Sequence, residues 1–325
     1  MRRPPADADW MAAAIALSLR GRPASAPNPN VGCILINDGR VVGRGWTQAG
    51  GRPHAEAIAL VAAGDAARGA TAYVSLEPCA HASPRGPCCT DALIAAGVAR
   101  VVIAAQDPDS RTNGKGIARL RDAGLSVVVD VMATEARMAM APWWRRQVQD
   151  RPFVTLKLAT SLDGCIARAD GASRWITGAR ARAHGHLERA MHAGILVGRG
   201  TYDADSPKLD VRLSGLESRS PQRFLLTSGG APAGWTAVAS PESVAGVDSL
   251  LVEGGAGAAS AFLAADRVDR LLLYRAPILF GGGKAALGDI GLTDLADAHG
   301  RWRLADSRLL GSDRLDVYER VREGP

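Results

Sequence analysis

Two short segments of the chain contain side chains that bind metals. His54 and Glu56 are separated by one residue in "RPHAEAIAL", and Cys79 and the pair Cys88-Cys89 follow in "LEPCAHASPRGPCCTDALI". One imidazole and two thiolates leave the fourth zinc position open, which is the arrangement of catalytic zinc. The sequence therefore predicts a Zn²⁺ site formed by His54, Cys79 and one cysteine of the pair.

The carboxyl group of Glu56 gives this predicted site a general acid–base. H-x-E followed by P-C and a further Cys is the signature of zinc deaminases that act on nucleobases. A carboxylate two residues from a zinc ligand can take a proton from water and deliver it to the ring nitrogen and the departing amine. A structural zinc site would need a fourth protein ligand, for which His81 is the candidate, and would leave Glu56 without a role.

The third zinc ligand is either Cys88 or Cys89. A ligand at a helix N-terminus gains from the helix dipole, which favours the thiolate. Leu93, the first apolar residue of the following helix, lies one turn after Cys89, whereas one more residue in the preceding loop costs little. We therefore predict Cys89 as the ligand and keep Cys88 as the alternative.

The composition limits the classes of protein that the chain can belong to. Its 325 residues suggest two domains, and 47% hydrophobic with 22% charged residues fit a soluble globular protein. No apolar run approaches the about 18 residues that span a membrane, and the N-terminus indicates an amphipathic helix rather than a signal peptide, so a cytoplasmic location is expected. The net charge of +6 suits anionic substrates, but no Lys/Arg block with interleaved aromatic residues indicates nucleic acid.

The first half of the chain, residues 1–149, contains the elements that must position the zinc site. Two apolar runs joined by "NDGR" predict a β-hairpin over residues 31–46. Strands separated by helices predict a three-layer α/β domain. The expected helices cover residues 54–64, 90–97, 116–124 and 134–151, and the further strands cover 71–77, 99–107 and 125–130.

A second series of strands and helices occupies residues 150–325. The expected strands cover residues 153–164, 193–200, 223–228, 249–255, 270–283 and 314–321, a helix covers 258–267, and residues 203–221 form a loop. The glycines of "VEGGAGAAS" lie between a strand and a helix, where backbone N–H groups bind phosphate well. The alternative for these glycines is a tight turn that needs positive φ angles.

The first half resembles the deaminase half of the bifunctional riboflavin-biosynthesis deaminase–reductases. The resemblance rests on "NPNVGCILINDGRVVGRGW", "PHAEAIAL", "SLEPCAH", "PCCTDALIAAGVARVVIAAQDPD" and "GKGIARLRDAG". It implies a cytidine deaminase-like fold and deamination of a 2,5-diamino-6-ribosylamino-pyrimidinone 5′-phosphate, with Asn28 and His81 in the pyrimidine pocket. In most relatives eight residues separate the two cysteine ligands, which favours Cys88 and disagrees with the helix-phase argument.

The second half resembles the reductase half of the same family, through "KLATSLDG" and "SRWIT". The resemblance implies a dihydrofolate reductase-like fold, hydride transfer from NADPH to the ribosyl C1′, and a homo-oligomer. It implies NADPH contacts from Ala159, Trp175, Thr201, Asp205, Ser228, Gly255, Ala256, Gly257, Ala258, Ala259, Ser260 and Ala261, and substrate contacts from Ser173, Arg189, Leu209, Arg212 and Glu253.

Several of these residues also have alternatives. Arg189 and Arg212 fit a ribose phosphate, because Arg forks match phosphate oxygens, but either could be a solvated charge. Trp175 could be core packing. Lys157 lies in a strand that looks buried, so it is paired or in the substrate site, and Asp163 is a candidate partner. Where the family often shows Thr-Val-x-x-Asp-Asp-Pro, this chain has "TYDADSP".

Two other functions compete with a bifunctional enzyme that uses Zn²⁺, NADPH and a phosphorylated pyrimidine substrate. A nucleic-acid-editing deaminase with an appended binding domain would need a basic stripe with stacking aromatics, which the sequence lacks. A structural zinc module joined to a nucleotide-binding regulatory domain would make Glu56→Ala silent. The sequence therefore favours the enzyme, with no nucleic-acid partner and no membrane partner.

Overall fold

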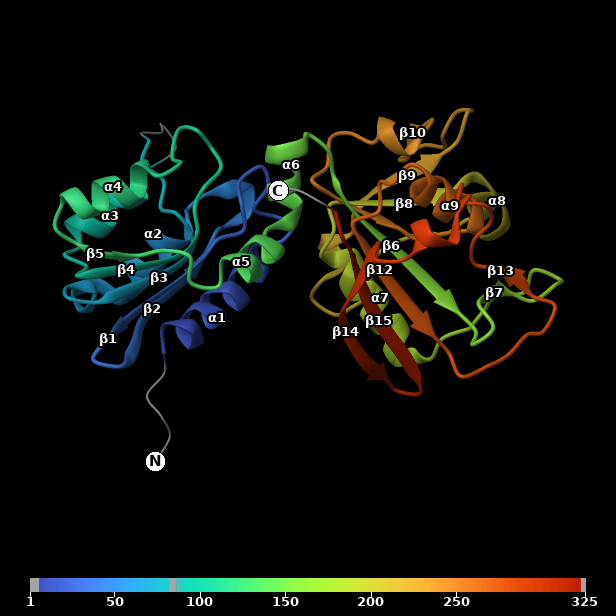
Figure 1. Ribbon diagram of the computed structural model, residues 1–325, viewed down its shortest axis with the longest axis horizontal. Helices are drawn as coiled ribbons and strands as arrows, with labels where there is room; N and C mark the ends of the chain where they lie inside the picture. Colours follow the sequence, from blue (N-terminus) through green and yellow to red (C-terminus); the bar gives the residue numbers. More distant parts are fainter. Residues whose placement is uncertain (1–5, 82–85, 87, 323–325) are drawn as a thin grey trace. The chain divides into compact units, whose positions relative to one another are not determined.

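The computed structural model describes residues 6–81, 86 and 88–322. The chain divides into two compact units, residues 1–150 and 151–325. Each unit contains its own β-sheet with helices against it (Figure 1). No helix among the described residues combines the length and the hydrophobicity needed to cross a bilayer.

The first unit is built on a five-stranded sheet of order β2-β1-β3-β4-β5. β1 pairs antiparallel with β2 and β3, whereas β3, β4 and β5 are parallel. The strands are β1 (Gly32–Asn37), β2 (Arg40–Trp46), β3 (Thr71–Leu76), β4 (Arg100–Ala105) and β5 (Ser126–Val128). The predicted hairpin over residues 31–46 is confirmed, since β1 and β2 are joined by a two-residue turn.

Helices cover both faces of this sheet, as the three-layer prediction requires (Figure 1). α1 packs on β1 and β3 and contacts α5, whereas α2 packs on β2 and β1 and contacts α3. The helices are α1 (Asp7–Ser18), α2 (Ala55–Ala63), α3 (Cys89–Ala95), α4 (Lys115–Asp122), α5 (Ala133–Ala139) and α6 (Ala141–Gln149), with 3-10 turns η1 (Leu19–Gly21), η2 (Ala49–Gly51) and η3 (Gly64–Ala67).

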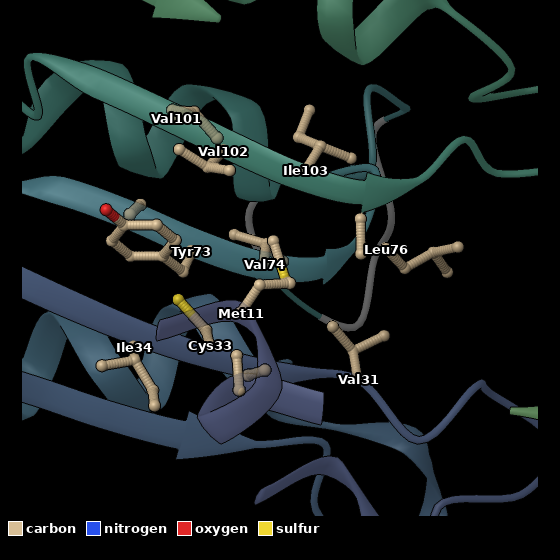
Figure 2. Close-up of a cluster of buried hydrophobic side chains, with 14 of the residues drawn as sticks. Met11, Val31, Cys33, Ile34, Tyr73, Val74, Leu76, Val101, Val102 and Ile103 are labelled. Atoms are coloured by element: carbon tan, nitrogen blue, oxygen red, sulfur yellow. The ribbon is translucent and has the colours of Figure 1, made fainter. Parts of the chain in front are cut away.

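The core of the first unit covers both faces of the sheet, and one part of it lies between the sheet and helix α1. Figure 2 shows Met11 of α1 beside Cys33, Val74 and Ile103 from three neighbouring strands, and all four are completely buried. Cys33 thus behaves as the small buried residue that its apolar surroundings in the sequence suggest, and Cys165 in the second unit is buried as well.

Two glycines of β2 fix the position of helix α2. A Cβ atom on Gly43 would lie 2.1 Å from the carbonyl oxygen of Ala59, and one on Gly45 would lie 2.3 Å from that of Ala55. Such distances leave no space for any side chain, so the backbone of α2 rests directly on the strand. The residues at the start of α2 therefore have a defined position relative to the sheet.

The prediction of a single helix over residues 134–151 is wrong, because two helices occupy this segment. The structure divides it into α5 and α6, with Met140 between them at φ −102° and ψ 14°. Pro142 cannot donate a backbone hydrogen bond and is tolerated at the start of a helix, so it begins a new helix instead of continuing the first.

The second unit contains an eight-stranded sheet of order β10-β9-β8-β11-β6-β12-β15-β14. The six strands from β10 to β12 are parallel, and β15 and β14 add antiparallel strands at one edge. The strands are β6 (Phe153–Thr160), β8 (Gly194–Gly198), β9 (Gln222–Leu226), β10 (Thr236–Val238), β11 (Ser249–Val252), β12 (Arg270–Arg275), β14 (Trp302–Leu310) and β15 (Asp313–Arg320), with β7 (Cys165–Ala167) and β13 (Lys284–Ala285) forming a separate pair.

The helices of the second unit are α7 (Ala179–Ala190), α8 (Arg199–Asp205) and α9 (Ala256–Ala264), with η4 (Glu217–Arg219), η5 (Pro241–Ser243) and η6 (Leu295–Ala298). The main core cluster joins Leu156, Leu196, Val252 and Phe262, so α9 packs directly on the parallel strands. Helix α8 extends into the segment 203–221, for which the sequence predicts a loop, and ends at Asp205.

Candidate functional site

The three predicted zinc-binding side chains lie together in the first unit. The nitrogen and sulfur atoms of His54, Cys79 and Cys89 are all within 4.8 Å of one another. His54 Nδ1 lies 3.2 Å from Cys89 Sγ and 3.6 Å from Cys79 Sγ. His54 is the N-cap of α2, Cys79 follows β3, and Cys89 is the first residue of α3. Two helix starts and one strand end thus meet at a single point.

The charges within this cluster fit a cation. The hydrogen bond with Cys89 lowers the pKa of the Cys79 thiol, and the same contact, together with burial, raises the pKa of the Cys89 thiol. By themselves, two sulfur atoms this close in a buried position share one negative charge. A divalent cation between them allows both to ionise, and zinc prefers this set of sulfur and nitrogen donors.

The other candidate ligands point elsewhere. Cys88 Sγ donates a hydrogen bond to the carbonyl oxygen of Cys79 at 2.7 Å, and Cys88 is not in the metal-binding cluster. His81 Nδ1 lies 3.3 Å from Thr112 Oγ1. Among the described residues, the cluster therefore contains three protein donors and leaves a fourth position for water. This geometry favours Cys89 over Cys88.

Glu56 lies in the first turn of α2, two residues after His54, and only 3% of its surface is exposed. Burial raises the pKa of its carboxyl group. The side chain reaches the wall of the pocket that also contains His54 and Cys79. A carboxyl group in this position can exchange protons with a molecule bound beside the metal ligands.

Asn28 holds the second nitrogen of the His54 ring. Its Nδ2 atom lies 3.1 Å from His54 Nε2 and donates to the carbonyl oxygen of Gly51 at 3.0 Å. When Nδ1 binds a metal, Nε2 carries the ring proton and donates, so the amide oxygen of Asn28 and not Nδ2 must face it to accept that proton. Asn28 also lines the pocket, so the structure places it where the family resemblance expects it and adds a contact with the metal ligand.

A cavity of about 310 Å³ lies entirely within the first unit, and the residues that line it include Asn28, His54, Glu56, Cys79 and His81. Its wall also contains residues that the sequence did not single out, chiefly polar ones from the segment after β4 and from helix α6: Arg52, Asp107, Asp109, Arg111, Trp143 and Gln147. β3 and β4 are parallel, so their carboxyl ends meet at one edge of the sheet. The "QDPD" segment after β4 could therefore have been placed beside Cys79 from the strand order alone.

The two acids of this segment differ in their environment. Burial raises the pKa of Asp107 to about 6, whereas hydrogen bonds from Arg111 lower the pKa of Asp109 to about 2. Glu77, directly before Pro78 and Cys79, accepts backbone N–H groups from Asp107 and Gly116. This carboxylate ties the metal-ligand segment to the start of α4.

The second unit has a crevice-forming topology at the carboxyl ends of its parallel strands. β8 leads through α8 to β9 on one side, and its neighbour β11 leads through α9 to β12 on the other. Adjacent strands whose connections run in opposite directions form a topological switch point, where open α/β sheets bind their ligands.

Backbone groups and small residues meet closely at this switch point. Gly255 precedes α9 with φ 46°, and a Cβ atom on it would lie 2.5 Å from Thr201 Oγ1. Thr201 Oγ1 lies 3.4 Å from the carbonyl oxygen of Gly254. The segment from Gly255 to Gly257 therefore exposes the N-terminus of a nine-residue helix beside the end of β8, which suits a phosphate group.

Three of the remaining residues of the predicted cofactor stretch are buried. Ala258 and Ala259 belong to the core, and Ser260 Oγ accepts the Gly288 N–H at 2.8 Å. Leu209 likewise packs against Ile195 and other core residues. The side chains of these four residues are thus occupied by packing, and only their backbone could contact a ligand.

A charged cluster lies beside the switch point. Arg189 donates to both carboxylate oxygens of Glu253, from Nε at 2.6 Å and from Nη2 at 2.9 Å, and Lys157 Nζ lies 3.9 Å from Glu253. The partner of Lys157 is therefore Glu253 and not Asp163. Asp163 instead accepts hydrogen bonds from Ser161 and from the backbone of Gly281.

The other predicted residues lie on several segments of the second unit. Trp175 is 65% exposed, with the Arg182 guanidinium 4.7 Å from its ring centre, so it is not core packing. Asp205 pairs with Arg174 at 3.5 Å, and Arg212 lies 3.5 Å from Asp210. Of the other residues predicted to contact cofactor or substrate, Ala159 lies in β6, Ser173 lies two residues before Trp175, and Ser228 follows β9.

The pairing of Glu253 predicts a pH-dependent stability. Burial opposes the charge, but Arg189 and Lys157 outweigh it and lower the pKa of Glu253 to about 2 from its usual value of 4.5. This difference corresponds to about 3 kcal/mol of folding free energy at neutral pH. Because the folded-state pKa is depressed, the contribution is complete above pH 4.5 and is lost as the pH falls toward 2.

Urea unfolding of the wild type and of Glu253→Gln from pH 7 to pH 3 checks this expectation. The variant should be less stable by about 3 kcal/mol at pH 7, and the difference should shrink below pH 4.5. A stability difference that is constant across this pH range would contradict the assignment.

Comparison with known proteins supports this division into two sites. Residues 4–105 match the cytidine and deoxycytidylate deaminase zinc-binding region, and residues 152–236 and 243–315 match the RibD C-terminal domain. The riboflavin biosynthesis protein RibD of Escherichia coli is 38% identical over 94% of this chain and 97% of its own length. That of Mycobacterium tuberculosis strain H37Rv is 38% identical over 94% of this chain and 95% of its own.

Solved structures agree with these matches. A diaminohydroxyphosphoribosylaminopyrimidine deaminase/5-amino-6-(5-phosphoribosylamino)uracil reductase from Thermotoga maritima superposes with a TM-score of 0.87 at 30% identity, covering 97% of this chain and 99% of that one. RibD from Acinetobacter baumannii gives a TM-score of 0.84 at 32% identity with the same coverage.

The fold and the sites thus define a two-domain α/β enzyme, in which a zinc-dependent deaminase domain precedes an NADPH-dependent reductase domain. The predicted fold class is confirmed. The chain belongs to the RibD family of riboflavin biosynthesis proteins and is a bifunctional deaminase–reductase.

Proposed function

We propose that residues 1–149 deaminate 2,5-diamino-6-ribosylamino-4(3H)-pyrimidinone 5′-phosphate, and that residues 150–325 then reduce the ribosyl group of the product to ribityl with NADPH. The observation that carries the proposal is the cluster of His54, Cys79 and Cys89, because two of its members, His54 and Cys79, line one pocket together with the buried Glu56. The Thermotoga maritima relative is named for both activities, as a deaminase and a reductase.

In the first reaction, water replaces the amino group of the pyrimidine ring, and ammonia leaves. Zinc held by His54, Cys79 and Cys89 supplies the Lewis acid that makes water nucleophilic near neutral pH. The Glu56 carboxylate accepts one proton from the attacking water and delivers it to the ring nitrogen. It then carries a second proton, from the new hydroxyl group, to the amine, which leaves as ammonia. The side-chain amide of Asn28 lies against the outer nitrogen of the His54 ring.

The pocket wall accounts for binding of the pyrimidine phosphate. His81 and Asn28 face the ring with polar groups, and the cationic side chains of Arg52 and Arg111 lie on the same wall. Guanidinium groups suit a phosphate dianion. The volume of about 310 Å³ is at the lower end of the range for small-molecule sites.

In the second reaction, the C1′–O4′ bond of the ribosyl group opens to give the imine form. A hydride from the nicotinamide of NADPH adds to C1′ while a proton adds to the imine nitrogen, and the protein mainly positions the two reactants. The switch-point crevice with Gly255, Ala256 and Thr201 receives the cofactor. Arg189 is held by Glu253 and by the Asp210 carbonyl oxygen, so it supports the wall of the substrate site. Arg212, whose side chain is 61% exposed, is free to turn toward the substrate phosphate.

A coupled assay tests the proposal directly. The full chain is given the diaminopyrimidinone phosphate, first without and then with NADPH. Ammonia should be released in both cases, and the NADPH absorbance should fall only when the deaminated product is present. Consumption of NADPH without ammonia release, or no reaction of either kind, would contradict the proposed sequence of reactions.

The cytoplasmic location, the homo-oligomer and the lack of a nucleic-acid partner remain predictions from the sequence. Light scattering of the purified chain, with and without added nucleic acid, tests the last two.

A further inference from the structure

The proposed cofactor crevice has two ends that differ in their side chains. Lys157 on β6 and Glu253 after β11 lie on one side of the switch point. A hydride donor must lie beside the substrate, so the nicotinamide belongs on this side. The adenosine end of the dinucleotide then extends the other way, over the carboxyl ends of β8 and β9.

The carboxyl end of β9 holds one guanidinium group in a fixed position. Arg199, directly after β8, donates to Thr227 Oγ1 from Nε at 3.4 Å and from Nη2 at 3.3 Å. The same Nη2 donates to the carbonyl oxygen of Gly230. Thr227 Oγ1 also accepts the N–H of Gly229 at 3.1 Å, so the side chain is anchored over the turn that contains Ser228.

The charge of Arg199 is only weakly compensated. Its two hydrogen-bond acceptors are neutral, and its acidic neighbour Asp203 is 3.7 Å from Nη1 with a side chain that is 60% exposed. The Arg199 side chain is itself 39% exposed, so a ligand can reach it. A rigid, accessible guanidinium beside a hydroxyl group suits a phosphate dianion, which it can bind through charge-assisted hydrogen bonds.

We propose that Arg199, together with Thr227 and Ser228, binds the adenosine 2′-phosphate and thereby selects NADPH over NADH. The 2′-phosphate is the only group that distinguishes these cofactors, and the adenosine end lies on this side of the crevice. The proposal rests on the proposed placement of the dinucleotide at the switch point.

Equilibrium binding of two adenosine fragments to the full chain tests the proposal. Titration calorimetry with 2′,5′-ADP and with 5′-AMP isolates the contribution of the 2′-phosphate without any turnover. Arg199→Gln keeps the ability to donate to Thr227 and removes the charge. It should therefore lower the affinity for 2′,5′-ADP by about tenfold or more and leave the affinity for 5′-AMP nearly unchanged. The affinity of Arg199→Lys for 2′,5′-ADP should lie between those of the wild type and the glutamine variant, because lysine keeps the charge but lacks the paired N–H donors of a guanidinium group.

Arg223→Gln is the matched control. Arg223 lies on β9, four residues and about 13 Å before Thr227, and its guanidinium stacks 5.5 Å from the centre of the Trp235 ring. Its removal should change neither affinity by as much as threefold. Three results would overturn the role of Arg199. They are an equal loss of affinity for both fragments in Arg199→Gln, no loss of affinity in that variant, or the same loss of affinity in Arg223→Gln.

Failure of the wider cofactor assignment gives a different result. If the wild type binds neither 2′,5′-ADP nor NADPH, the placement of the dinucleotide fails, and the role of Arg199 fails with it. If the wild type binds both ligands and Arg199→Gln binds them equally well, only the selectivity proposal is lost.

Discussion

Glu56→Gln is expected to reduce the rate of deamination by about 100-fold or more while the zinc content stays at the wild-type level. The amide has nearly the same shape as the carboxyl group but cannot carry a proton from water to the pyrimidine. Glu56 is not among the three clustered donors, so its replacement leaves the metal ligands in place. Ammonia release and metal analysis of the same preparation measure the two quantities.

A reciprocal variant in the second unit is the control for this experiment. Glu253 is the corresponding buried glutamate there and is paired with Arg189. Glu56→Gln should still reduce the deaminated intermediate with NADPH, whereas Glu253→Gln should still release ammonia from the first substrate. Near-normal deamination by Glu56→Gln would remove the proton-transfer role, and loss of both activities in one variant would indicate a general folding defect.

Cys89→Ser is expected to lose most of the bound zinc, and with it deamination by about 100-fold or more, because water that is not activated by the metal ionises near pH 15.7 instead of about 7. Cys88→Ser should keep full zinc. The structure places Cys89 Sγ 3.2 Å from His54 Nδ1, whereas Cys88 Sγ donates to a backbone carbonyl oxygen.

These two variants form a matched pair, since they change neighbouring residues by the same single atom. Full zinc in Cys89→Ser together with loss in Cys88→Ser would reverse the ligand assignment. Partial loss in both would show that either thiol can take the third position.

Much of the first unit could be predicted because its signals are local. The "NDGR" turn between two apolar runs defines the hairpin, and His54 and Glu56 are neighbours on one helix turn, whatever the rest of the chain does. The sequence alone could not decide between Cys88 and Cys89, because the spacing in the family favours Cys88 and the phase of the following helix favours Cys89. The structure begins α3 at Cys89 and so follows the helix phase.

Most of the features that could not be predicted from the sequence are contacts between segments that lie far apart along the chain. Lys157 and Glu253 are 96 positions apart, and nothing local indicates that they pair, so the nearby Asp163 looked like the better partner. Asp107 and Asp109 enter the deaminase pocket only because β3 and β4 are parallel neighbours. Arg199 acquires a possible role only once the strand order brings the end of β8 beside the end of β9.

The narrow gap between β2 and α2 has a consequence for changing what the deaminase accepts. Since Gly43 and Gly45 leave no room for even a methyl group, α2 cannot roll or slide, and the imidazole and carboxyl groups on its first turn need no rearrangement during a catalytic cycle. That wall of the cavity is rigid and offers nothing to redesign. Attempts to admit a bulkier heterocycle should begin at Trp143 and Gln147 of α6, which also line the cavity.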